Sequence, residues 1–248
     1  MSKIATAPEP RLDRTRRPRA PWLAPTGLIL LSLIPVLAGA SRITEVTGLG
    51  GAAVATQQNA RFLDSPVPVL THIVSATVFS LVGAFQFLPA RRVGPAVRRW
   101  GKWHRAAGRI LIPAGLLAAL SGLWMALFYP HPPGDGTLLL ALRLVFGSAM
   151  VASIALGIGA IVRRDFIRHG RWMTRAYAIG VAAGTQALLL IPGSMAFGST
   201  DELSRAVLMG AGWVVTLLAA EYLISRRSRP AQSRAKPPED GDSLRPIA

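Results

Sequence analysis

The stretch ARRVGPAVRRWGKWHRAAGRILIPAGLLAALSGLWMALF, residues 90–128, decides the fold because it joins a basic run to a long apolar run. Seven lysines and arginines lie between residues 91 and 109, and no charged residue follows Arg109 as far as Phe128. An apolar run of about 20 residues is long enough for a helix to cross the hydrocarbon core of a bilayer. Basic residues flank such helices mainly on the cytoplasmic side. This stretch therefore predicts a transmembrane helix that starts in the cytoplasm.

The composition of the whole chain indicates the same class of protein. Of its 248 residues, 51% are hydrophobic and 16% are charged, and the mean hydropathy is +0.38. A soluble domain carries about 25% charged residues. The net charge of +16 would suit nucleic acid, but the charges lie in short clusters between apolar runs. We therefore expect the lipid bilayer, and no nucleic acid, as the partner.

Six apolar runs of this kind predict an all-α fold, a polytopic transmembrane helical bundle with six spans. Their ranges are 23–41, 68–88, 107–128, 137–162, 173–192 and 206–224. They divide the chain into a disordered basic cytoplasmic arm at 1–22, a six-helix transmembrane domain at 23–225 and a disordered cytoplasmic tail at 226–248. The AGA triplet at 38–40 would also suit a signal-peptidase site, but the basic lead-in is long for a signal peptide. We expect an uncleaved first span, since cleavage would leave five spans.

The placement of the basic residues predicts how the bundle is oriented. Segments 1–22, 91–109, 163–175 and 226–248 hold 24 of the 28 lysines and arginines. All four segments would lie on one side of a six-span bundle, so the positive-inside rule places both the N- and C-termini in the cytoplasm. Their arginines would also contact anionic lipid headgroups at the cytoplasmic face.

Polar side chains at membrane depth are costly and are therefore candidates for a functional site. His72 and Gln86 lie on one face of the second span, about 21 Å apart along the helix. Arg143 in span four and Gln186 in span five lie toward the same outer side as His72, so these three side chains predict an outer polar cluster. The alternatives are that Arg143 extends to the outer headgroups and that His72 hydrogen-bonds a backbone carbonyl.

A second polar group lies at the cytoplasmic ends of the third and fifth spans. The motif HRAAGR contains His104, Arg105 and Arg109, and the motif RHGRWMTRAY contains His169, Trp172 and Arg175. Orientation signals and contacts with lipid phosphates would account for the arginines. They do not account for the histidines, which add nothing to the charge rule.

The glycines of the spans predict close helix packing, because small residues let helices in lipid approach one another. Examples are Gly83, Gly115, Gly157, Gly180 and Gly184. Tight packing of the bundle is sufficient to explain nearly all of them.

The types of residue present limit the chemistry that the chain can perform. It has no cysteine, which excludes disulfides and thiolate metal sites, and it has four histidines. No Ser–His–Asp or H-E-x-x-H pattern occurs and no paired carboxylates lie in the spans, so no catalytic residue is predicted. Histidine commonly ligates haem iron. A b-type haem could be held by His72 with a partner, or by His104 with His169.

Three motifs resemble a known family. They are THIVSATVFSLVGAFQFLP at 71–89, WHRAAGRI at 103–110 and HGRWMTRAYA at 169–178. They are similar to a bacterial family of uncharacterised "predicted membrane proteins", a domain-of-unknown-function family, and the likeness covers about residues 60–225. The resemblance implies an inner-membrane location and supplies no activity. The family typically has an arginine where this chain has Gln186, which removes a charge from that place. The HRxxGR element is also similar to one in transmembrane cytochromes b and ferric-reductase-like proteins.

Three hypotheses for the function follow from these observations. In the first, the polar stripe of His72 and Gln86 binds or moves a small solute, a proton or a lipid. In the second, a b-type haem carries electrons within the membrane. In the third, the protein is a non-catalytic assembly partner whose basic tails dock to lipid or to another protein.

Overall fold

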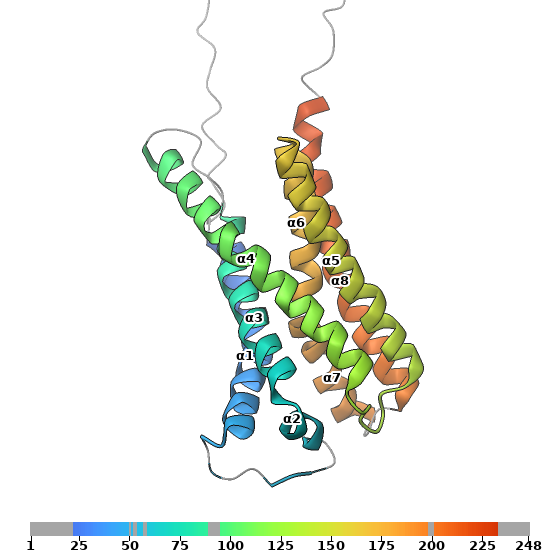
Figure 1. Ribbon diagram of the computed structural model, residues 1–248. Helices are drawn as coiled ribbons and strands as arrows, with labels where there is room; N and C mark the ends of the chain where they lie inside the picture. The colour runs from blue at the N-terminus through green and yellow to red at the C-terminus, as the bar shows by residue number, and fades with distance from the viewer. Residues whose placement is uncertain are drawn as a thin grey trace, which may run out of the picture.

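The computed structural model describes residues 22–49, 51, 54–56, 59–88, 95–197 and 201–232, and these form a bundle of helices without strands (Figure 1). The helices are α1 (Leu23–Thr47), α2 (Ala60–Asp64), α3 (Pro66–Ala84), the 3₁₀ turn η1 (Phe85–Phe87), α4 (Pro95–Phe128), α5 (Thr137–Val162), α6 (Phe166–Gly180), α7 (Ala182–Phe197) and α8 (Glu202–Gln232). Six stretches are long and apolar enough to cross a membrane. The predicted all-α fold with six spans is therefore confirmed.

Several helices continue beyond the apolar runs that predicted them. The first span ends at Thr47 rather than near residue 41, where Gly48 takes a left-handed conformation (φ 72°) and stops the helix. Helix α4 begins at Pro95, inside the expected basic loop, and α8 runs to Gln232, seven residues into the expected tail. Hydropathy marks only the part of a helix that lies in hydrocarbon, whereas backbone hydrogen bonding continues until a residue interrupts it. Residues 1–21 and 233–248 lie outside the described residues.

The two ends of the bundle differ in what they contain. The N-terminal end of α1 and the C-terminal end of α8 lie at one end of the bundle. Helix α2 and the turn between α4 and α5 lie at the other end, called here the α2 end (Figure 1). Helix α3 packs between α1 and α4, and α7 packs between α1 and α8. Helix α6 contacts α3, α4, α5 and α8. The α6–α7 span is therefore the most enclosed part of the bundle.

The fifth span is not the single helix expected over 173–192. Helix α6 begins at Phe166, because the Asp165 side chain caps it by accepting a hydrogen bond from the Arg168 backbone N–H (2.9 Å). It ends at Gly180, and α7 starts after one non-helical residue, Val181. A Cβ on Gly180 would lie 2.8 Å from Phe79, so this glycine belongs to a tight helix contact. Glycine favours the helical conformation less than other residues, which agrees with an interruption at this position.

Close helix approach at glycines is confirmed. A Cβ on Gly83 of α3 would overlap the ring of Tyr177 in α6. The Tyr177 hydroxyl donates a hydrogen bond to the Ser80 backbone oxygen (2.7 Å), again joining α6 to α3. At Gly184 the contact is with the backbone of α1 itself. The glycine positions therefore set how closely the helices that enclose the cavity described below approach one another.

Candidate functional site

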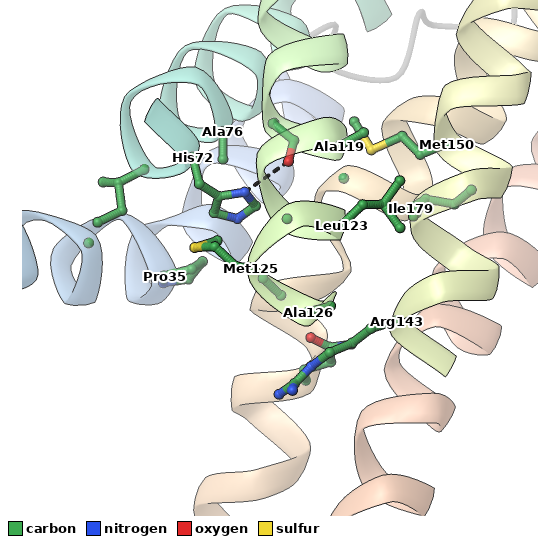
Figure 2. A pocket seen from close by; sticks show the side chains of 18 of the residues that line it. Pro35, His72, Ala76, Ala119, Leu123, Met125, Ala126, Arg143, Met150 and Ile179 are labelled. Atoms are coloured by element: carbon green, nitrogen blue, oxygen red, sulfur yellow. Dashed lines mark hydrogen bonds between the residues drawn. The ribbon is translucent and has the colours of Figure 1, made fainter. Parts of the chain in front are cut away.

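A cavity of about 430 Å³ lies within the bundle toward its α2 end. Every helix contributes to its wall, together with the turn between α4 and α5. Most of the lining is apolar, as Figure 2 shows with Pro35 of α1, Leu123 and Met125 of α4, and Met150 of α5. Pockets that hold small molecules in proteins typically enclose about 300–1,000 Å³ and combine apolar walls with a few polar groups. This cavity has the size and the lining of such a pocket.

His72 is a polar side chain that α3 contributes to this cavity (Figure 2). Its Nδ1 lies 2.8 Å from the Ala118 backbone oxygen and 3.3 Å from Ser121 Oγ, both on α4. A carbonyl oxygen only accepts, so Nδ1 carries a proton and donates it. In the neutral ring, Nε2 then keeps a lone pair with which a molecule in the cavity can bond. The predicted alternative for His72, a hydrogen bond to a backbone carbonyl, is therefore present, and it leaves the second ring nitrogen available.

An aromatic layer closes the cavity on the side away from the α2 end. Phe79 lines the cavity, and its ring centroid lies 5.7 Å from that of Tyr177. Gln86 lies beyond this layer, in η1, and is not among the lining residues. Its amide oxygen and nitrogen are buried and have no hydrogen-bond partner within the described part of the chain. The stripe expected to join His72 to Gln86 is therefore divided between two separate environments.

Charged side chains gather where the cavity reaches the α2 end. Asp135, in the turn between α4 and α5, accepts from Arg143 (2.7 Å) and from Arg205 of α8 (2.8 Å). Its side chain is only 3% exposed, while those of Arg143 and Arg205 are 28% and 37% exposed. Arg143 and Asp135 line the cavity. Arg143 thus has an acidic partner inside the protein, in place of the headgroup contact considered from the sequence.

Arg61 of α2 is a second lining arginine, and it has a different environment. Its Nη1 donates to the Pro130 backbone oxygen (3.1 Å), and its guanidinium lies 4.6 Å from the ring centre of Phe62. Its Nε is buried without a hydrogen-bond partner in the described ranges, and no carboxylate there forms an ion pair with it. Burial lowers the pKa of the Arg61 guanidinium, the negative charge of Asp135 opposes this change, and the positive charges of Arg143 and Arg42 lower the pKa further. Burial likewise raises the pKa of the neighbouring Tyr129 hydroxyl.

Gln186 of α7 also lines the cavity, but it is fixed to α8. Its side-chain amide donates to the Met209 backbone oxygen (3.0 Å), and only 7% of the residue is exposed. His72, Arg143 and Gln186 therefore face one cavity, as their positions in the sequence suggested. Each has its own partner, respectively Ala118, Asp135 and Met209, so the three side chains share the cavity without being bonded to one another in the described part of the chain.

One family model matches more than half of the chain. The family described as "Predicted membrane protein (DUF2306)" matches residues 69–224. The chain belongs to this family. No curated protein and no solved structure matches it. The resemblance carried by the three sequence motifs is confirmed at the level of the family, and with the six apolar spans it identifies a multi-pass membrane protein.

The DUF2306 match covers only part of the cavity. It includes His72, Arg143 and Gln186, and it ends within α8. Helix α1 and Arg61 precede the matched segment, although both contribute to the cavity wall. In this DUF2306 chain, therefore, part of the cavity is built by residues outside the segment that defines the family.

The second polar group lies at the end of the bundle opposite α2. Arg175 binds Glu221 of α8 through two hydrogen bonds (2.5 and 3.0 Å) and stacks over the ring of Trp172 at 4.7 Å. His169 Nδ1 lies 2.9 Å from the Gly157 backbone oxygen. His104 of α4 lies at this same end of the bundle (Figure 1). Arg105 and Arg109 are exposed on α4.

Metal ligation has no direct support at either group. No three His, Asp or Glu side chains among the described residues gather as metal ligands. Haem ligation stays a prediction from the sequence.

Sequence reasoning missed the importance of Asp135, Arg61 and Arg205. All three lie in turns or at helix ends, where polar residues usually face water. One signal was present: Arg42, Arg61, Arg143 and Arg205 are the four basic residues outside the basic segments. In a bundle of six spans, all four lie on the same side as the turn YPHPPGDG at residues 129–136, which contains Asp135.

Proposed function

We propose that this protein binds a small molecule in the cavity around His72, with the α2 end facing away from the cytoplasm of a bacterial cell. The observation that carries the proposal is the state of the His72 ring. Its Nδ1 is held by Ala118, so the ring is fixed and Nε2 is the nitrogen left for a ligand. A buried polar group in an otherwise apolar pocket is the usual means of orienting a small ligand. No catalytic residue is assigned.

Movement of a solute through the bundle would need a further conformational change. Phe79 and Tyr177 separate the cavity from Gln86, and the Tyr177 hydrogen bond to Ser80 holds this contact in place. Binding from the α2 end requires no such change. We therefore propose binding as the function, and passage only if this aromatic layer opens.

The proposal is tested with purified protein in lipid nanodiscs and a screen of small polar and amphiphilic compounds for a rise in thermal unfolding temperature. A compound that stabilises the wild type is expected to bind His72→Ala about fivefold more weakly, because one hydrogen bond contributes about 1 kcal/mol. Gln86→Ala is the matched control, since Gln86 lies beyond the aromatic layer, and it should retain wild-type affinity. Equal affinity of His72→Ala and the wild type for every stabilising compound would contradict the proposal. A Soret absorption band in the purified protein would instead support the haem alternative.

The proposed orientation has its own test. The basic segments hold 24 of the 28 lysines and arginines, and we propose that they lie in the cytoplasm beside anionic headgroups of the inner membrane. A reporter fused before residue 1 and one inserted near residue 167 should both report the cytoplasmic side. One inserted near Gly134 should report the opposite side. Reporters at 1 and 167 on different sides would contradict both the orientation and the count of six spans.

A further inference from the structure

The charges that face the cavity are unequal in number. The lining includes two arginines, Arg61 and Arg143, and one carboxylate, Asp135. Asp135 is already shared between Arg143 and Arg205. The nearby Glu45 is engaged by Arg42 (2.5 Å) and by the Asn59 amide (2.5 Å). Among the charged side chains that line the cavity, the arginines therefore outnumber the carboxylates by one.

Arg61 is the lining arginine that forms no ion pair with a carboxylate in the described part of the chain. Arg143 and Arg205 each have Asp135 as a partner, whereas the hydrogen bond recorded for Arg61 goes to a neutral carbonyl, that of Pro130. Its Nε is buried and unbonded, so one donor of the guanidinium lacks an acceptor in the described part of the molecule. A guanidinium in this state binds an anion strongly, because it provides several donors in a plane as well as charge. Arg61 therefore has no carboxylate of its own in the described part of the molecule, because Asp135, the acidic group of the lining, is bound by two other arginines.

We infer that the cavity receives an amphiphilic anion, whose carboxylate or phosphate pairs with Arg61 at the mouth and whose apolar chain extends inward past His72 toward Phe79. This inference rests on the proposed function and specifies the class of ligand. The apolar wall formed by Pro35, Leu123 and Met150 excludes a fully hydrophilic anion as the best fit. An alkyl cation has an apolar chain that fits the wall, but its charge would be repelled by Arg61 and Arg143 at the mouth. A neutral alcohol fits the wall and leaves Arg61 without an acceptor.

The test compares three probes with the same chain and different charge: octanoate, 1-octanol and octylammonium. Each is added at equal concentration to the wild-type protein in nanodiscs of phosphatidylcholine, and thermal unfolding is followed by tryptophan fluorescence. Octanoate is expected to give the largest rise in unfolding temperature. Arg61→Gln should increase its half-saturating concentration at least about tenfold, since a charge-assisted hydrogen bond is lost. Arg61→Lys should recover part of the effect because it restores the charge.

The matched control is Arg42→Gln. Arg42 lies over the same Phe62 ring as Arg61 (4.8 Å), but it does not line the cavity, so octanoate affinity should stay close to that of the wild type. A second arm replaces part of the phosphatidylcholine with phosphatidylglycerol and omits octanoate. If Arg61-dependent stabilisation appears only with phosphatidylglycerol, a lipid is the source of the anion. If it appears only with octanoate, the source is a free carboxylate.

The outcomes separate this inference from the proposed function. If 1-octanol or octylammonium stabilises as well as octanoate, the anion assignment is overturned and small-molecule binding stands. If octanoate stabilises Arg61→Gln and the wild type equally, the role of Arg61 is overturned. If neither the three probes nor phosphatidylglycerol changes the unfolding temperature, the inference fails, and the His72 screen decides separately whether a ligand of another class binds.

Discussion

Replacement of Gly184 by alanine is expected to lower the thermal unfolding temperature by about 6–12 °C, which corresponds to about 3 kcal/mol for a chain of this size. The new Cβ would overlap the Leu31 backbone oxygen and lie 2.8 Å from its carbonyl carbon. Both atoms belong to the backbone of α1, so no side-chain rotation relieves the overlap. Helices α1 and α7 must move apart, and α1 supplies part of the cavity wall. Ligand binding should therefore weaken together with stability.

Gly159→Ala is the control for this prediction. A Cβ at Gly159 of α5 would meet nothing within 4 Å, so the same substitution there should leave the unfolding temperature unchanged or slightly raised. The measurement is thermal unfolding of both variants in the same lipid, together with the yield of monodisperse protein. Similar unfolding temperatures for Gly184→Ala and Gly159→Ala would show that the contact between α1 and α7 is looser than the geometry indicates.

The sequence predicted the number of spans because the bilayer itself fixes their length and composition. The span at 137–162 agrees with α5 at both ends. The contact at Gly184 could not be predicted in the same way. The glycine content indicated close packing, but the partner of each glycine depends on which helices are neighbours. That arrangement arises from contacts between residues far apart in the chain, as between Gly184 and Leu31.

The break in the fifth span shows how local signals compete with hydropathy. Residues 173–192 are apolar enough to predict one helix, yet helix α6 starts seven residues earlier, at Phe166. Asp165 carried the signal for that start, since aspartate is a preferred N-cap. The interruption at Val181 follows Gly180, which packs tightly against Phe79 of another helix. A contact of this kind is absent from any local window of sequence.

The candidate site was half predictable. His72, Arg143 and Gln186 were identified because each is polar at membrane depth, and all three line the cavity. Arg61 and Asp135 were not identified, because a polar residue in a turn ordinarily faces water and loses no hydration energy. Their significance comes from burial, which only the fold produces: the Asp135 side chain is 3% exposed. The acceptor role of His72 Nε2 likewise required the position of the Ala118 carbonyl.

Asp135→Asn is expected to destabilise the ligand-free protein and to strengthen its binding of an anion. The substitution keeps the shape of the side chain and removes the charge that Arg143 and Arg205 share. Loss of one partner from a buried ion pair costs about 3–5 kcal/mol. Both arginines are partly exposed, so water compensates for part of this loss and we expect about 2 kcal/mol, or about 4–8 °C in unfolding temperature.

The opposite change in binding distinguishes this prediction from a simple loss of structure. When residue 135 is neutral, Arg143, like Arg61, has no carboxylate partner. Octanoate should therefore raise the unfolding temperature of Asp135→Asn more than that of the wild type. Asp64→Asn is the control, because Asp64 is exposed on α2 at the same end of the bundle, and its removal should change neither quantity appreciably. A destabilised Asp135→Asn that has also lost its response to octanoate would mean that the aspartate builds the binding site, rather than competing with the ligand for the arginines.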